Sequence, residues 1–85
     1  MEIRLLKYFL AIAREENMTK AAASLHIAQP SLSTQMKELE NSLGQQLFIR
    51  GKRKITLTDE GIILRKRAEE VLQLIELTEK EITLN

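Results

Sequence analysis

The sequence predicts a mostly α-helical protein with three helices, a short two-stranded β hairpin and a long final helix. Its 85 residues include only three Gly and one Pro, too few for an all-β chain with many tight turns. Apolar residues recur at helical spacing along most of the chain. The 44% hydrophobic fraction can form a small core, and the length allows one domain with at most one appended element.

The first two helices are expected before residue 26. The first, Glu2 to Glu16, carries one apolar stripe: Leu5, Leu6, Phe9, Ile12 and Ala13. Thr19 is expected to cap a short alanine-rich helix from Lys20 to about Leu25. His26 then lies in a turn where positive φ is tolerated, and Ile27 is expected to be buried there.

A third helix is expected to open at Gln29-Pro30 and to end at about Leu43, before Gly44. Its inward stripe is Leu32, Met36, Leu39 and Leu43. The opposite face carries small or polar side chains: Pro30, Ser31, Ser33, Thr34, Lys37 and Asn41. A face that only meets solvent usually carries more Glu and Lys, so this one is predicted to contact a partner.

Two short strands are expected at residues 47–50 and 55–58. The tip between them is strongly basic, with Arg50, Lys52, Arg53 and Lys54. Residues 1–67 carry twelve Lys and Arg against seven Asp and Glu (+5), whereas residues 68–85 carry one Lys against five Glu (−4). This asymmetry suggests a basic surface for a polyanion, although the tip alone is also compatible with a solvated turn.

The last helix is expected to start after Thr58 as cap and to run from Asp59 to about Thr83. A seam of 3.5-residue spacing follows it: Leu64, Ala68, Val71, Ile75, Thr78 and Ile82. Part of this helix, near Ile62 and Ile63, is expected to pack on the first helix. The distal half reaches too far for that, so a second copy of the helix is expected to cover it.

These elements together predict a winged helix-turn-helix domain at residues 1–58, followed by a linker and dimerisation helix at 59–85. In that architecture the third helix enters the major groove of DNA. The basic hairpin, or wing, reaches phosphates or the neighbouring minor groove.

A series of spaced residues also carries a family pattern without a gap over about residues 1–62. They are Leu6-Lys7-Tyr8-Phe9, Met18-Thr19-Lys20-Ala21-Ala22, Leu25-His26, Ala28-Gln29-Pro30-Ser31-Leu32-Ser33, Gln35, Leu39-Glu40, Leu43-Gly44, Leu47-Phe48, Arg50, Leu57-Thr58 and Gly61. With them the sequence resembles the N-terminal domain of LysR-type transcriptional regulators.

The resemblance implies which residues meet DNA: Thr19, Ala22, Gln29, Pro30, Ser33 and Lys37, with Arg50 and Arg53 in the wing and Thr58 at a phosphate. Ser31, Lys52 and Lys54 are added to this predicted interface by their place beside these residues. Thr34 stands where the family commonly has arginine, so a thymine methyl or a phosphate is its expected contact instead of a guanine.

The resemblance also implies a homodimer on an interrupted inverted repeat, in the cytoplasm of a bacterium. The chain is then expected to be the DNA-binding fragment of a longer regulator. A small-molecule effector is expected to act only on a domain outside this chain, and any assembly beyond the dimer is expected in the longer protein.

Enzymes, metal sites and membrane spans are not expected. The chain has no Cys and a single His, and it lacks a phosphate-binding glycine loop. No cofactor is therefore predicted. The longest apolar run, Tyr8 to Ala13, is too short to cross a bilayer. Arg65, Lys66 and Arg67 are expected to be surface charges. For Gln29 and Ser33 the alternative to a DNA contact is capping or solvating their helix. The competing function is a winged-helix module that binds protein and dimerises without reading DNA.

Overall fold

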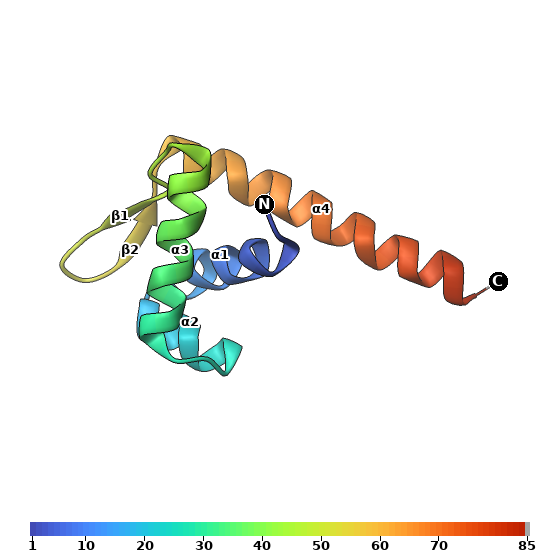
Figure 1. Cartoon of the computed structure of the whole chain (residues 1–85), viewed down its shortest axis with the longest axis horizontal. Coiled ribbons are helices and arrows are strands. Elements are labelled where there is room, and N and C mark those ends of the chain that lie inside the picture. Colours follow the sequence, from blue (N-terminus) through green and yellow to red (C-terminus); the bar gives the residue numbers. More distant parts are fainter. Residues whose placement is uncertain (85) are drawn as a thin grey trace.

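The computed structural model describes residues 1–84, so Asn85 of the predicted linker helix lies outside the described residues. In chain order the elements are α1 (Ile3–Glu15), α2 (Met18–Leu25), α3 (Gln29–Leu43), β1 (Phe48–Arg50), β2 (Ile55–Leu57) and α4 (Asp59–Thr83). Figure 1 shows α1, α2 and α3 packed together, with the hairpin projecting on one side and α4 extending on the other. The predicted fold class is therefore confirmed.

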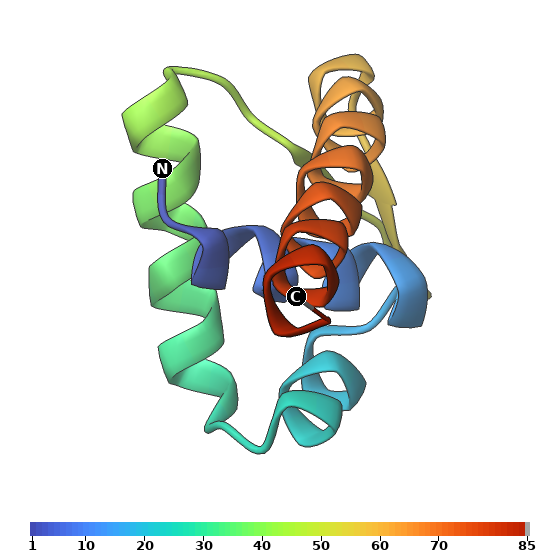
Figure 2. The ribbon, with the colours of Figure 1, turned by 90° about the vertical axis from the view of Figure 1, so that its right-hand side faces the viewer.

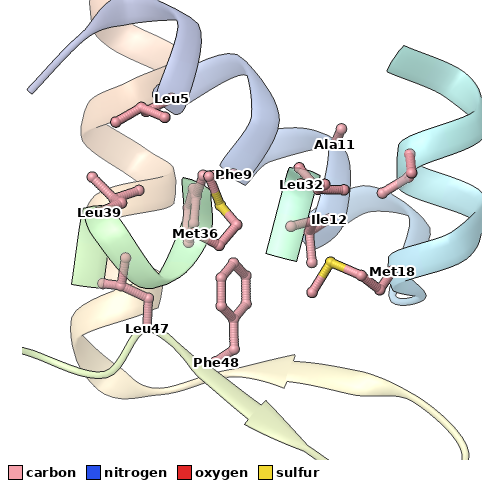
Figure 3. Packing of buried hydrophobic residues seen from close by; sticks show 12 residues of the cluster. Leu5, Phe9, Ala11, Ile12, Met18, Leu32, Met36, Leu39, Leu47 and Phe48 are labelled. Atoms are coloured by element: carbon pink, nitrogen blue, oxygen red, sulfur yellow. The ribbon is translucent and has the colours of Figure 1, made fainter. Parts of the chain in front are cut away.

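A small apolar core lies between the first three helices and the hairpin. Its fully buried side chains are Phe9, Ile12, Leu32, Met36, Leu39 and Leu47. Phe48 of β1 closes the core from below, and its ring centroid lies 5.3 Å from that of Phe9 at a tilt of 39° (Figure 3). This aromatic contact fixes the hairpin to the helices. A two-stranded sheet is only marginally stable alone, so it needs such packing.

Four apolar residues differ in burial from the predictions. Ala11 is buried, whereas Ala13 is only half-buried, because the close packing of α2 against α1 takes up the side of α1 that carries Ala11. Leu43 is 40% exposed because α3 ends there, and the chain turns away at Gly44 with φ +66°. Ile27 is half-buried and packs against the edge of the core.

The start of α2 was predicted two residues too late. Asn17 is the N-cap, and its side-chain oxygen accepts a hydrogen bond from the Lys20 N–H at 2.8 Å. Met18 then becomes the first helical residue and is buried, while Thr19 lies exposed in the first turn. Asn and Thr are both good caps, and the burial of Met18 favours the earlier one. At the other end of α2, the positive φ predicted for His26 is confirmed at 58°.

The strands are antiparallel, pairing Phe48 with Leu57 and Arg50 with Ile55, and each is one residue shorter than predicted. Leu47 lies outside β1 because its N–H donates to the Glu40 carboxylate at 2.7 Å. Its carbonyl accepts from the Thr58 N–H at 3.0 Å. These two bonds fix the hairpin base to α3 and to the start of α4.

The helix α4 has the predicted length and cap, but it packs differently from the prediction. Ala68 is 1% exposed, and Leu64 packs against the core. Ile62 and Ile63 were expected to pack on α1 and are instead exposed, because the buried face of α4 passes through Gly61, Leu64 and Ala68. Figure 2 shows α4 crossing α1 before it leaves the body of the protein. Within residues 1–84 no helix combines the length and apolarity required to cross a bilayer.

Candidate nucleic-acid interface

The outward face of α3 has the predicted polar character. Pro30, Ser31, Thr34 and Lys37 are exposed, and Gln29 and Ser33 are half-buried. The first turn of α3 carries no acidic residue, and no side chain caps its N–H groups. The positive end of the helix dipole therefore meets no negative charge of its own helix, which favours an approaching anion.

An open hollow of about 320 Å³ lies on this face and is lined by Pro30, Ser31, Thr34 and Gln35. Its wall is mostly carbon, since the proline ring and the threonine methyl contribute to it. The Gln35 Oε1 atom is buried and has no hydrogen-bond partner among the described residues. This hollow is suited to a small apolar group. Pro30 and Thr34 were expected on this face, but the hollow itself was not predicted from the sequence.

A second open hollow, of about 540 Å³, joins α3 to the hairpin. Lys37 lies on one side of it and Arg50 on the other, so two of the predicted binding residues share one groove. Glu40 also lines the groove, and its carboxylate accepts the hydrogen bond from Leu47 N–H. Phe48 also lines the groove, and the remaining two lining residues are Gln46 and the exposed Ile49. Both were missed because the groove forms between segments that only the tertiary fold brings together.

The hairpin tip displays four basic side chains: Arg50, Lys52, Arg53 and Lys54 are all exposed. The Gly51 N–H donates to the Lys54 carbonyl at 3.0 Å, which closes the tip. Lys54 Nζ lies 3.6 Å from Glu16 Oε2. No other ion pair of the described residues involves a tip side chain.

Two predicted contacts are not placed as expected. Ala22 is 2% exposed, so its predicted place on the DNA-facing surface is wrong: its methyl packs in the core. Thr58 Oγ1 is already engaged, because it accepts from Gly61 N–H at 3.0 Å and donates to the Gln46 carbonyl at 2.7 Å. Thr19 lies exposed on α2, as its predicted role requires.

Of the six predicted dimer residues, the first two belong to the chain's own packing. Ala68 is buried against the same chain and Leu64 is half-buried, so the prediction that Ala68 contacts a second copy is wrong. Farther along, Ile75 is half-buried. We use the name distal face for the exposed residues Val71, Leu74, Leu77, Thr78 and Ile82. Leu74 is 63% exposed, and nothing among the described residues covers this face.

The described residues contain no group of three or more His, Cys, Asp and Glu placed to share a metal ion. The features of residues 1–84 that suit a partner are thus the polar face of α3, the basic tip and the distal face.

Comparison with known proteins gives consistent relatives. Residues 3–62 match the family described as "Bacterial regulatory helix-turn-helix protein, lysR family". The chain is 53% identical over 77 residues to the HTH-type transcriptional regulator BsdA of Bacillus subtilis (strain 168), covering 89% of this chain and 27% of that protein. It is 46% identical over 76 residues to the Hca operon transcriptional activator HcaR of Escherichia coli (strain K12), covering 89% of this chain and 26% of that protein. The chain thus spans about a quarter of the length of these curated relatives.

Solved structures share the whole architecture. The crystal structure of the BenM_DBD/catB site 1 DNA complex superposes with a TM-score of 0.94 at 41% identity, covering 98% of this chain and 92% of that chain. The crystal structure of the CbnR_DBD-DNA complex gives a TM-score of 0.93 at 39% identity, covering 99% of this chain and 97% of that one. The similarity therefore includes α4 as well as the first three helices and the hairpin.

Proposed function

Because the chain belongs to the LysR family of bacterial helix-turn-helix regulators, we propose that it is the DNA-binding part of a transcriptional regulator. In this proposal residues 1–58 bind double-stranded DNA, and α4 (Asp59–Thr83) serves as the linker and dimerisation helix. The protein acts by binding, without enzymatic activity, metal or cofactor. Its setting is the bacterial cytoplasm, where its operator DNA lies.

The observation that carries the proposal is the groove between α3 and the hairpin. It places Lys37 of the polar helix face and Arg50 of the basic tip on one open surface. A protein-binding module has no need for four cations beside a helix face of small polar residues. DNA presents both the phosphates that such cations bind and the base edges that short side chains read.

The helix α3 is assigned to the major groove. Gln29 and Ser33 lie near its N-terminal end and can reach base edges or phosphates, with Lys37 one turn beyond Ser33. Pro30 and Thr34 present apolar atoms to the major groove of DNA. The small apolar group that fits the hollow beside them is the 5-methyl group of a thymine.

The wing is assigned to the DNA backbone and the neighbouring minor groove. Arg53 is the side chain proposed to enter the minor groove, where narrow A·T segments have the most negative potential. Arg50 and Lys52 are the candidates for phosphate contacts, and Lys54 lies at the same tip beside Glu16.

The dimer is assigned to the distal face. Its apolar residues are costly to leave in water, and a second α4 can cover them. One dimer then presents two α3 helices to successive major-groove faces, about 34 Å apart, on an interrupted inverted repeat. Effector binding and any higher assembly belong to the longer regulator.

The decisive experiment is a selection from random duplex DNA with the purified chain, at about physiological salt. We expect enrichment of an interrupted inverted repeat with A·T pairs beside each half-site. The control is the same selection with Lys37→Ala plus Arg53→Ala, which should weaken binding and reduce the enrichment of the A·T pairs beside each half-site.

Three outcomes are informative. An inverted repeat supports dimeric, sequence-specific binding. Binding without any enriched motif would contradict the proposed base reading by α3. No binding even at low salt would overturn the DNA assignment and favour a protein-interaction module.

A further inference from the structure

Glu16 lies at the end of α1 in a backbone conformation that a residue with a side chain rarely adopts. Its φ is 56° and its ψ is 22°, in the left-handed region. The other two left-handed positions of the described residues are His26 and Gly44, each of which also ends a helix. Unfavourable backbone conformations persist where the surrounding contacts hold them, so the contacts of Glu16 are informative.

Two of those contacts fall on consecutive residues of the wing. The Glu16 carbonyl accepts a hydrogen bond from Ile55 N–H at 2.9 Å, at the first residue of β2. The Glu16 carboxylate lies 3.6 Å from Lys54 Nζ. Glu16 therefore holds the tip end of the wing, at Ile55 through the main chain and at Lys54 through a charge.

The ion pair changes what the wing can offer to DNA. Lys54 is the one tip cation of the described residues that has a carboxylate within 4.0 Å. Both side chains of the pair remain about half exposed, so a phosphate approaching Lys54 meets a carboxylate beside it. A phosphate contact by Lys54 requires that this pair separate, whereas Arg50, Lys52 and Arg53 have no such partner.

We propose that Glu16 is a positioning residue of the wing, which anchors β2 through its carbonyl and withholds Lys54 from DNA through its carboxylate. This inference rests on the proposed DNA binding. It adds that the wing contacts DNA with three cations instead of four, and that the glutamate at the end of α1 sets this number.

The test measures how the affinity for a fixed duplex depends on salt in wild-type and Glu16→Gln protein. Each neutralised phosphate adds about 0.9 to the magnitude of the slope of log K against log salt. Glu16→Gln should free Lys54 for one phosphate, so the slope should steepen by up to about 0.9. The affinity should rise about fivefold at about 0.15 M salt, on selected and random duplex alike.

The matched control is Glu15→Gln. It removes the same charge from the neighbouring position, where the carboxylate pairs with Arg14 at 3.2 Å and not with the wing. We expect it to leave the slope at the wild-type value. An equal steepening by Glu15→Gln would overturn the proposal, because the effect would then be one of net charge alone.

A double substitution identifies Lys54 as the group that is released. Adding Lys54→Gln to Glu16→Gln should return the magnitude of the salt slope to the wild-type value. Lys54→Gln in the wild-type background should reduce that magnitude by less than it does in the Glu16→Gln background. Equal losses in the two backgrounds would mean that Lys54 already contacts DNA beside Glu16, which contradicts the proposal.

Amide hydrogen exchange of the free protein tests the main-chain part. The Ile55 amide should be protected in wild-type and in Glu16→Gln, since both retain the accepting carbonyl. Fast exchange in wild-type would overturn the anchoring role. Failure of the wild-type protein to bind any duplex would instead overturn the proposed function, so the two failures are distinguishable.

Discussion

On the outward face of α3, Ser33 and Lys37 lie four residues apart and therefore on the same side of the helix. Ser33 is half-buried and Lys37 is exposed beside the groove that leads to Arg50. A short hydroxyl close to the helix surface suits a base edge, and a flexible ammonium suits a phosphate. The two residues are therefore expected to contribute to different parts of the binding free energy.

We predict that Ser33→Ala with Lys37→Ala weakens binding to the selected operator about a hundredfold and to random duplex about tenfold. Fluorescence anisotropy with both duplexes measures the two losses. Lys80→Ala at the far end of α4 is the control for a lost positive charge and should change neither affinity. Equal losses on both duplexes would show that these residues hold only phosphate.

Gly61 and Gly44 illustrate two different uses of glycine. A Cβ on Gly61 would overlap the Leu47 carbonyl oxygen, so the first turn of α4 can sit against the hairpin base only without a side chain. Gly44 has no atom within 4 Å of such a Cβ, but its φ of +66° disfavours any side chain.

Gly61→Ala is expected to lower the free energy of unfolding by about 3 kcal/mol, because backbone must move to relieve the overlap. Gly44→Ala is expected to lower it by only about 1 kcal/mol, the cost of the left-handed conformation. Urea unfolding followed by circular dichroism measures both. A smaller loss for Gly61→Ala than for Gly44→Ala would contradict the packing described for the hairpin base.

At the scale of elements, Thr58 joins the wing to α4. Its hydroxyl accepts from Gly61 N–H and donates to the Gln46 carbonyl, so it caps the helix and also fixes the segment that leads into β1. Asp59 and Glu60 follow at the positive end of the helix dipole. The start of α4 is thus specified by three side chains in sequence.

Thr58→Ala should lower the free energy of unfolding by about 1–2 kcal/mol, since both hydrogen bonds are lost. Thr58→Ser keeps the hydroxyl and should lose less than half as much. Thermal unfolding followed by circular dichroism separates the two variants. If Ser and Ala destabilise equally, the methyl group and not the cap is what stabilises this junction.

The start or end of a helix was predictable where only one nearby residue suits that boundary. Pro30, Gly44 and Thr58 are of this kind, and α3 and α4 have the predicted bounds. The start of α2 was not, because Asn17 and Thr19 are equally good caps and only the burial of Met18 selects between them.

The residues of the candidate site also fall into two groups, those predictable from local sequence and those that depend on tertiary packing. The polar face of α3 and the basic tip follow from helical phase and local charge. Alanine, however, is compatible with a core or a surface position, so Ala22 and Ala68 were assigned to the wrong environment. The approach of Glu16 to Lys54 depends on the packing of α1 against the hairpin, which no local pattern contains.

At the scale of the whole molecule, the protein is 49 Å long, and the distal face is the part of α4 that is proposed to form the dimer. Leu74→Glu places a charge in the middle of that face and should raise the dimer dissociation constant at least about tenfold, because a buried unpaired carboxylate is unfavourable. Gln73→Glu adds the same charge on another side of α4 and is the control. Sedimentation equilibrium measures both, and an unchanged dimer in Leu74→Glu would move the interface elsewhere.

The helix α4 runs without a break from the hairpin base to Thr83. An unbroken helix behaves as a rod with a fixed angular phase: one inserted residue turns everything beyond it by about 100° and moves it about 1.5 Å. Seven inserted residues move the far end about 10 Å but restore its direction to within about 20°. The length of α4 therefore sets which way any following domain faces relative to α3, and insertions of one residue and of seven have opposite consequences for that direction.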